Sequence, residues 1–309
     1  MVNFIIHPGF VKTGSTFFQK NVIPKLNNFI SIGKPYDDRN SLHHKIKLLF
    51  YSEQSRIVKK KLIDKIILEI LLKLENKKKK NIIFSDEAFL DSEFYYPKKN
   101  IYYLKELINN LRKKTKVNVR FILSTRNQKN LIISRFAYVY PNLKEKYSTL
   151  ESYVNSNIKK NTFFFQSLKF HKFKNLIQRE FNCKTNYLPL ELLEDNKIKY
   201  LNLLKKIFFS NLNVGKIKFS KKNVNSQNDN FFIKKGNNWF ETYLILRRMK
   251  FLIPAKHTTS LKKFISKKIK FNKSDITISH NDKTLRKINK YFLPDNKKLF
   301  QKYKINYLS

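Results

Sequence analysis

The chain has 309 residues, and its 65 Lys and Arg against 22 Asp and Glu give a formal net charge of +43. Its length allows a full hydrophobic core, its single cysteine (Cys183) excludes an intrachain disulfide, and no apolar run reaches the roughly 20 residues that would cross a bilayer. We therefore expect a cytoplasmic protein without a membrane span, whose lysines, spread from end to end, cover a solvated surface rather than form a nucleic-acid-binding patch.

Short apolar runs alternate with longer amphipathic segments, which is typical of a parallel sheet covered by helices. The expected strands are residues 2–7, 81–85, 119–125 and 185–190. The expected helices are residues 15–26, 56–74, 101–114, 128–138 and 168–181. Beyond about residue 211 the periodicity weakens, and helices are expected only near residues 239–251 and 284–292. We predict an α/β fold: a single domain over residues 1–309, with a parallel central sheet flanked by helices and a less regular C-terminal part.

A loop suited to an anion follows the first expected strand. The sequence there reads HPGFVKTGSTFFQ, in which Gly9 and Gly14 flank Lys12, and Ser15 and Thr16 open the first helix. Backbone N–H groups at a helix N-terminus attract phosphate, and glycine lets the main chain approach it. The glycines have the spacing of the nucleotide-hydrolase pattern GxxxxGK[ST], but Ser15 stands where that pattern has lysine. The loop predicts a phosphate site in which Lys12 reaches the bridging oxygen between the phosphate and the group that is transferred from it. No acidic residue for Mg²⁺ is evident.

The run GFVKTGSTFFQ resembles the 5′-phosphosulfate loop of sulfotransferases that use 3′-phosphoadenosine 5′-phosphosulfate (PAPS), whose usual form is close to K-[ST]-G-[ST]-T. The resemblance implies a P-loop-like fold and transfer of a sulfuryl group from PAPS to a hydroxyl or amine of an acceptor. It also implies that Lys12 contacts the 5′-phosphate and the bridging oxygen, whereas Thr13, Gly14, Ser15 and Thr16 hold the phosphate.

A second anion site is expected after the strand VRFILST. Arg126 stands at its end, and Ser134 follows eight residues later, two turns into the next helix. Arginine offers a planar fork that matches phosphate oxygens, and serine adds a further donor. The pair resembles the 3′-phosphate motif of the same family, although Gln128 and Asn130 occupy positions where the family often has Pro and Asp. The expected cofactor is PAPS, with 3′-phosphoadenosine 5′-phosphate (PAP) as its product and without a metal.

Further segments resemble bacterial members of the family that act on carbohydrate. NYLPLELLED is similar to their strand and short acidic segment, YFLPDNKKLFQKY to their C-terminal ending, and residues 234–236 to a basic, glycine-containing loop over the 3′-phosphate. The resemblance implies a glycan acceptor, chosen by variable loops at residues 35–56 and 138–161 and by the C-terminal third. Tyrosines such as Tyr138 and Tyr147 could stack on sugar faces or belong to the core.

The reaction also needs a base, because the acceptor must lose a proton as it attacks, while charge develops on the departing phosphate oxygen. Lys12 would offset that charge. For the base, the run NIIFSDEAFLD places Asp86 and Glu87 just after a strand, and similar carbohydrate sulfotransferases have a Glu in this loop. We expect Glu87 to be the base, with Asp86 or His7 as alternatives, and either carboxylate could instead cap the next helix.

Two other functions remain open at this stage. A P-loop nucleotide kinase or hydrolase shares the glycine spacing, but the position of Lys12 and the lack of evident Mg²⁺ ligands count against it. A basic nucleic-acid-binding protein would gather its charges on one face, and its affinity would fall steeply with salt. The sequence does not indicate an oligomeric state, and no spacing of His and Cys suggests a metal site.

Overall fold

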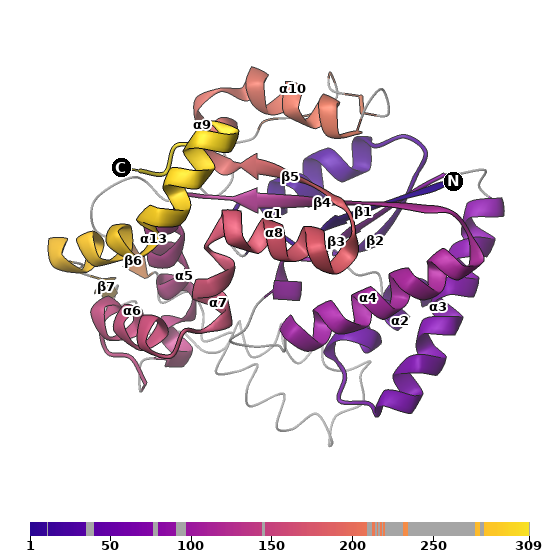
Figure 1. Ribbon diagram of the computed structural model, residues 1–309, viewed down its shortest axis with the longest axis horizontal. Helices are drawn as coiled ribbons and strands as arrows, with labels where there is room; N and C mark the ends of the chain where they lie inside the picture. The colour runs from indigo at the N-terminus through magenta and orange to yellow at the C-terminus, as the bar shows by residue number, and fades with distance from the viewer. Residues whose placement is uncertain are drawn as a thin grey trace, which may run out of the picture. The chain divides into compact units, whose positions relative to one another are not determined.

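In a computed structural model of the chain, five β-strands form one all-parallel sheet (Figure 1). The strands are β1 (Val2–His7), β2 (Phe29–Gly33), β3 (Asn81–Ser85), β4 (Val117–Thr125) and β5 (Lys184–Pro189). Their order is β2-β3-β1-β4-β5, so β1 lies between β3 and β4. The register pairs His7 with Ser85, Ser85 with Gly33, and Thr125 with Pro189. The carboxyl ends of the strands therefore meet at one edge of the sheet.

The chain divides into two units. The first comprises Met1–Leu131, Asn157–Lys222 and Lys287–Ser309, and the second comprises Ile132–Ser156 and Asn223–Arg286. The structure describes residues 1–10, 12–34, 40–76, 80–90, 97–143, 146–208, 212–213, 215, 217, 219, 231–233, 276–278 and 281–308.

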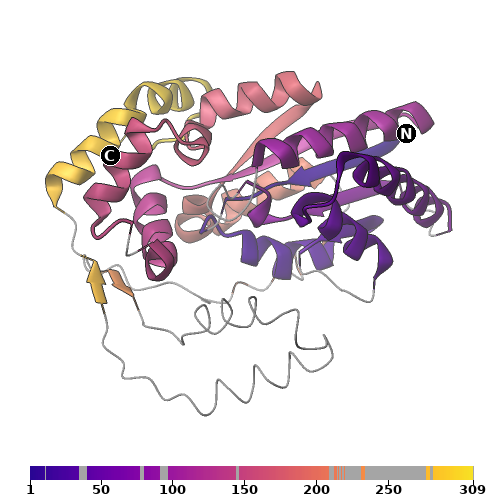
Figure 2. The same ribbon diagram turned by 90° about the horizontal axis from the view of Figure 1, so that it is seen from below.

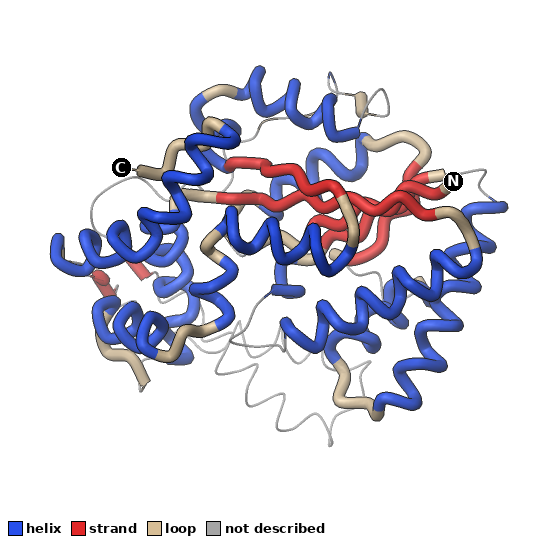
Figure 3. The backbone as a smooth tube through the Cα atoms, viewed as in Figure 1, coloured by secondary structure: helices blue, strands red, loops and turns tan. Residues whose placement is uncertain are grey.

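Helices connect the strands and cover both faces of the sheet (Figures 2 and 3). The α-helices are α1 (Ser15–Phe17), α2 (Ser41–Tyr51), α3 (Arg56–Asn76), α4 (Pro97–Lys114), α5 (Gln128–Leu143), α6 (Leu150–Lys159), α7 (Phe163–Ser167), α8 (Phe170–Phe181), α9 (Leu190–Asp195), α10 (Lys197–Phe208) and α13 (Asp282–Tyr303). The π-helical segment η1 (Phe18–Val22) continues α1, and two 3₁₀ segments are η2 (Ile23–Lys25) and η3 (Glu87–Leu90).

Alternate residues of each strand face opposite helical layers, as the two-residue period of a strand requires. One face of the sheet contributes Ile5, Ile83, Ile122 and Leu188 to a core that is completed by apolar side chains of η1 and α10. On the other face, the ring of Phe84 lies 5.5 Å from that of Phe50 in α2, and Phe121 lies 4.8 Å from Phe181 in α8. Burial on both faces explains why the strands read as nearly continuous apolar runs.

The predicted parallel α/β fold is confirmed, and β1 and β3 begin and end where the sequence predicts. β4 begins two residues earlier than expected, at Val117, and β5 one residue earlier, at Lys184. The helix expected at 15–26 is composite, because a π-helical turn and a 3₁₀ turn containing Pro24 follow the short α1. The helix expected at 239–251 and residues 234–236 lie outside the described residues.

The variable loops assigned to residues 35–56 and 138–161 need correction, because both segments contain helices. Residues 41–51 form α2, whose first turn is capped by the side chain of Asn40, which accepts hydrogen bonds from the backbone N–H groups of Leu42 and His43. Residues 150–159 form α6. The sequence analysis did not predict either helix.

The second unit contains α6 and a short antiparallel pair of strands, β6 (Phe231–Ile233) and β7 (Ile276–Ile278). In its described part, the rings of Phe136 and Tyr153 pack with centroids 5.2 Å apart. Across the described residues of both units, every helix is too short or too polar to span a bilayer.

Candidate active site

The carboxyl edge of the sheet carries the polar residues that follow the strands. The loop after β1 contains Lys12, β3 is followed by Asp86 and Glu87, and β4 is followed by Arg126. All of these residues belong to the first unit. Ligands of open parallel sheets bind at this edge, near the point where the strand order reverses, and here the chain passes from β3 across β1 to β4.

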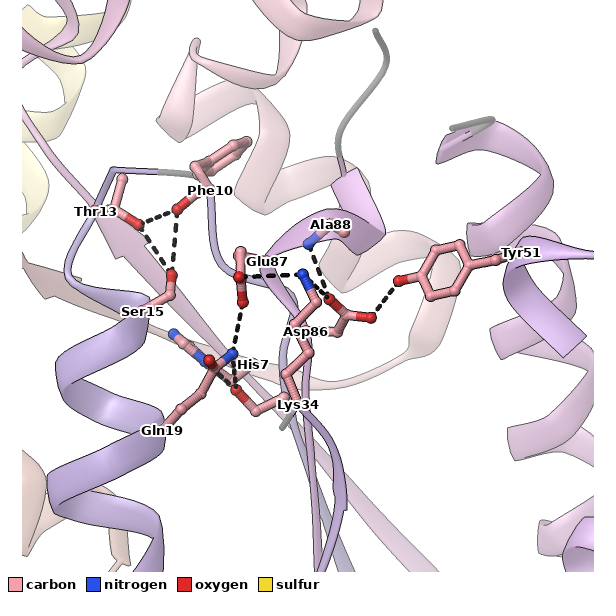
Figure 4. A network of polar contacts seen from close by, with 11 residues as sticks. His7, Phe10, Thr13, Ser15, Gln19, Lys34, Tyr51, Asp86, Glu87 and Ala88 are labelled. Atoms are coloured by element: carbon pink, nitrogen blue, oxygen red, sulfur yellow. Dashed lines mark hydrogen bonds and ion pairs between the residues drawn. The ribbon is translucent and has the colours of Figure 1, made fainter. Parts of the chain in front are cut away.

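The loop after β1 is a tight turn held by its own hydroxyl groups (Figure 4). Thr13 Oγ1 and Ser15 Oγ both donate to the carbonyl oxygen of Phe10, at 2.6 and 3.2 Å. Lys12 and Gly14 both have positive φ, at 72° and 79°. For a lysine this left-handed conformation is uncommon, and such conformations cluster at functional sites.

Glycine is required where this loop packs most closely. A Cβ added to Gly9 would lie 2.4 Å from Ser15 Oγ, and one added to Gly14 would lie 2.8 Å from Leu190 Cδ1. A hydroxyl group has one proton to donate, so Thr13 and Ser15 serve the loop itself in this arrangement. Among the described residues of the loop, the exposed side chains are those of Lys12 and Thr16.

Arg126 connects the end of β4 to this loop. Its Nη1 donates to the carbonyl oxygen of Lys12 at 3.2 Å. Two of the predicted phosphate-binding residues are therefore in direct contact. Ser134, the partner expected for Arg126 at the 3′-phosphate, lies in α5 and belongs to the second unit, so it is not part of the geometry described for the first.

Glu87 is held by two donors from different elements. Gln19 Nε2 donates to Oε2 at 2.7 Å, and Lys34 Nζ donates to Oε1 at 3.1 Å. Burial raises the pKa of Glu87, but the charge of Lys34 and the hydrogen bonds from Gln19, Lys34 and the main chain outweigh it and leave the pKa below its ordinary value. Its side chain remains 21% exposed. Glu87 is therefore an ionised carboxylate that solvent can reach.

Asp86, the alternative base, has a structural environment. It is fully buried, and its Oδ1 accepts the backbone N–H of Ala88 at 2.9 Å, which caps η3. Oδ2 accepts a hydrogen bond from the hydroxyl of Tyr51, and Lys34 Nζ lies 3.5 Å from Oδ1. In the view of Figure 4, Glu87 lies between the loop and Asp86. The capping role that the sequence allowed for either carboxylate belongs to Asp86.

His7, the other alternative, is buried under the edge. Its Nδ1 lies 2.8 Å from Ser85 Oγ, and its Nε2 lies 2.7 Å from Ser124 Oγ. Burial lowers the pKa of His7 to about 3, against a smaller opposing effect of the charge of Glu87. The imidazole is therefore neutral at physiological pH and joins β1 to both of its neighbours. In α2, His43 Nε2 lies 3.0 Å from the carbonyl oxygen of Ser31 in β2.

A further carboxylate at the edge was not predicted as a site residue. Glu191, in the first turn of α9, accepts the backbone N–H of Asn127 at 2.7 Å and the hydroxyl of Tyr307 at 3.0 Å. Burial raises the pKa of Glu191, although these hydrogen bonds and the charge of Arg126 oppose the effect. Tyr307 also lies 3.0 Å from Thr125 Oγ1, so the C-terminal segment supports the turn that carries Arg126.

Gln19 and Lys34 were also missed, and the sequence contains only an indirect signal for them. Gln19 follows the loop by one helical turn, and Lys34 directly follows a strand that the sequence analysis did not assign. Recognising Lys34 requires the knowledge that β2 pairs with β3, which places the two strand ends side by side.

In the part of the chain that the structure describes, no cluster of three His, Cys, Asp or Glu side chains is arranged to hold a metal ion. No protein-family model matches the sequence, and no curated protein is significantly similar to it. Functional assignment therefore rests on the loop motifs and on the geometry of this edge.

Proposed function

We propose that the chain is a sulfotransferase that transfers a sulfuryl group from PAPS to a hydroxyl or amine of an acceptor, with a glycan as the acceptor. The observation that carries the proposal is the hydrogen bond from Arg126 to the carbonyl of Lys12. It joins the two cationic residues whose motifs resemble the 3′- and 5′-phosphate sites of the family, at the edge that also carries Glu87.

The residues of this edge fit a ligand with two phosphate groups. Gly9 and Gly14 let the loop pack closely against Ser15 and Leu190, and the backbone N–H groups of such a tight turn are suited to bind phosphate. Lys12 and Thr16 are exposed on the loop, and Arg126 provides a second, planar cation beside it. For Ser15 to donate to a phosphate, its hydroxyl would have to turn away from the carbonyl of Phe10.

PAPS would supply the activated sulfuryl group at this edge. Lys12 would offset the negative charge that develops on the departing phosphate oxygen. Glu87 would take the proton of the attacking hydroxyl or amine, for which it is already ionised. Its lowered pKa also makes it a weaker proton acceptor, so the contacts of Lys34 and Gln19 with its two oxygens limit its basicity. Arg126, with Ser134 as a predicted partner, would distinguish PAPS from donors without a 3′-phosphate.

Ligand-induced stabilisation tests the proposal directly. We expect PAP to raise the unfolding temperature of the full chain in the presence of EDTA, because a ligand at 100 times its Kd stabilises the folded state by about 2.7 kcal/mol. ATP with Mg²⁺ should give a smaller shift at the same concentration. Incubation with [³⁵S]PAPS and a panel of neutral and acidic oligosaccharides should then label the acceptor class.

The alternatives predict different results. A P-loop kinase or hydrolase would be stabilised by ATP with Mg²⁺ and not by PAP in EDTA. A nucleic-acid-binding protein would respond to an oligonucleotide with an affinity that falls steeply with salt. Either result, without a response to PAP, would overturn the assignment.

A further inference from the structure

Gln19 connects the helix that begins at the phosphate loop with the carboxylate of Glu87. It lies in the π-helical segment η1, which continues α1 directly from Ser15, and only 8% of it is exposed. Its side-chain Nε2 donates to Glu87 Oε2 at 2.7 Å and contacts Ser85 Oγ at 3.2 Å. An amide nitrogen has two protons, so both are used.

The orientation of this amide follows from its neighbours. If the amide were turned over, its oxygen would face the carboxylate of Glu87, and two acceptors would meet without a proton between them. The Ser85 hydroxyl also contacts His7 Nδ1 at 2.8 Å, which ties this contact to the buried end of β1. Gln19 is therefore anchored at one side by β1 and β3 and acts at the other side on Glu87.

The other group on Glu87 has a different character. Lys34 Nζ is 3.1 Å from Oε1 and 3.5 Å from Asp86 Oδ1, so it is shared between two carboxylates, and its side chain is 33% exposed. Lysine is a flexible point charge with several donor directions. A buried amide whose two protons are both hydrogen-bonded therefore fixes the orientation of the Glu87 carboxylate more strictly than such an ammonium group does.

We propose that Gln19 is a positioning residue for Glu87: it fixes one carboxylate oxygen, so that the other remains the oxygen that can turn from Lys34 to an acceptor proton. This inference rests on the proposed function for its catalytic meaning, whereas the contact itself can be tested without a substrate. The groups that face Glu87 are Gln19 from η1, Lys34 from the end of β2, and His7 from β1. Asp86 adjoins Glu87 in the chain and shares Lys34 with it.

Two substitutions of Gln19 separate its hydrogen bond from its volume. Gln19→Met keeps a flexible side chain of similar length but removes the donor, and Gln19→Glu keeps the shape but sets a second carboxyl group against Glu87. Losing a donor to a carboxylate, or gaining a like charge, raises the pKa of that carboxyl group. In ¹³C NMR of protein labelled at the Glu carboxyl carbon, with the Glu87 signal assigned by Glu87→Gln, the Glu87 titration should move upward in both variants.

If Gln19 positions Glu87 for catalysis, substitution of Gln19 should lower turnover without weakening the binding of PAP. At saturating PAPS, release of [³⁵S]sulfate with water as the acceptor should fall about ten- to a hundred-fold in Gln19→Met, since misplacing a reacting group by about 1 Å costs on this scale. In this assay water attacks sulfur, the bond from sulfur to the bridging oxygen breaks, the bridging oxygen stays on PAP, and sulfate and the two protons of the water are released. The Kd for PAP should stay within about two-fold of wild type.

Asn81→Leu is the matched control. Asn81 is also a buried amide of this sheet, but it lies at the opposite end of β3 and donates to the carbonyl of Asn28. Its substitution should leave the Glu87 titration and the turnover at saturating PAPS unchanged.

Three results would overturn the inference: an unchanged Glu87 titration in both Gln19 variants, the same shift in Asn81→Leu, or unchanged turnover in Gln19→Met despite a shifted titration. If the wild-type protein did not bind PAP, the proposed function would be wrong. The Glu87 titration would still show whether Gln19 donates a hydrogen bond to Glu87.

Discussion

Arg126 Nη1 donates to the carbonyl oxygen of Lys12 at 3.2 Å, so a side chain at the end of β4 supports the main chain of the loop after β1. The supported residue itself has a left-handed backbone, at φ 72°. An arginine donor therefore satisfies the carbonyl of a residue whose conformation is itself unfavourable. The bond gives Arg126 two possible effects, one on the loop and one on a ligand, and these can be separated.

Arg126→Ala should weaken binding of PAP far more than binding of adenosine 5′-phosphosulfate, because only PAP carries a 3′-phosphate. Loss of the loop contact would weaken both ligands alike, so the difference between the two reports the phosphate contact alone. Arg126→Lys keeps the charge but loses the planar fork, and it should recover only part of the PAP affinity. Isothermal titration calorimetry measures the affinity of each of the two variants for each of the two ligands, relative to wild type. Equal losses of affinity for both ligands in Arg126→Ala would show that this residue does not bind the 3′-phosphate.

Gly14→Ala should destabilise the fold by about 1–2 kcal/mol from its positive φ alone, and by more because the new Cβ would lie 2.8 Å from Leu190 Cδ1. Leu190→Ala removes that neighbour, so the cost of Gly14→Ala should be smaller in the double variant. Urea unfolding gives each free energy. Gly215→Ala is the control, because among the described residues the nearest atom to a Cβ there is Asn213 Oδ1, at 3.9 Å. Additive costs in the double variant would exclude the contact with Leu190.

His7 predicts a loss of stability as the pH falls from 6.5. Its folded pKa of about 3 lies below the ordinary value of 6.5 because of burial, so between these values the unfolded chain binds a proton that the folded chain does not. Stability therefore falls toward acid, with a slope that approaches about 1.4 kcal/mol per pH unit. Burial also lowers the pKa of His171, which adds to the slope with the same sign.

Urea unfolding between pH 7.5 and 5 isolates this effect, because most carboxylates remain ionised there. His7→Gln should reduce the slope, and His43→Gln, on a partly exposed histidine of α2, should retain it. A wild-type stability that does not change across this range would contradict a neutral, buried His7.

The sequence predicts the strands best where both faces are buried. β1 and β3 are short runs of apolar residues that end at a polar loop, and their bounds follow from that pattern alone. β2 was missed because FISIG comes soon after the helix expected at 15–26, has an exposed Ser31 and ends in glycine. Its pairing with β3 is a tertiary property, and so is the position of Lys34 that depends on it.

The C-terminal helix is longer than the sequence predicts. The sequence analysis expected a helix near residues 284–292, which stops short of Pro294, a residue that removes a helical hydrogen bond. α13 instead continues to Tyr303. The residues after the proline are held by tertiary contacts: Asp295 accepts the backbone N–H groups that begin α8, and Asn296 exchanges hydrogen bonds with Gln128.

Some residues of the candidate site could likewise be predicted from the sequence, and others could not. Lys12, Arg126 and Glu87 could be named from motifs because each lies in the segment that follows a strand. Gln19 and Glu191 could not, because their roles depend on which side chain of another element they meet. Asp86 and Glu87 are adjacent in sequence, and only the structure shows that Asp86 is buried and caps η3 whereas Glu87 is partly exposed and meets Gln19.

Lys12→Ala and Glu87→Gln should separate the two catalytic roles by what each leaves intact. Lys12→Ala removes a cation that the ground-state phosphate and the departing oxygen both feel, so PAP affinity and turnover should fall together. Glu87→Gln keeps the shape and the contact with Gln19 but cannot accept a proton, so PAP affinity should change little while turnover falls roughly 100-fold or more.

Asp86→Asn, which removes charge from the capping carboxylate, should lower stability more than turnover per folded molecule. If Glu87→Gln kept near-normal turnover while Asp86→Asn or His7→Gln lost it, the base would be misassigned; if Lys12→Ala were also fully active, the proposed sulfuryl transfer itself would be wrong.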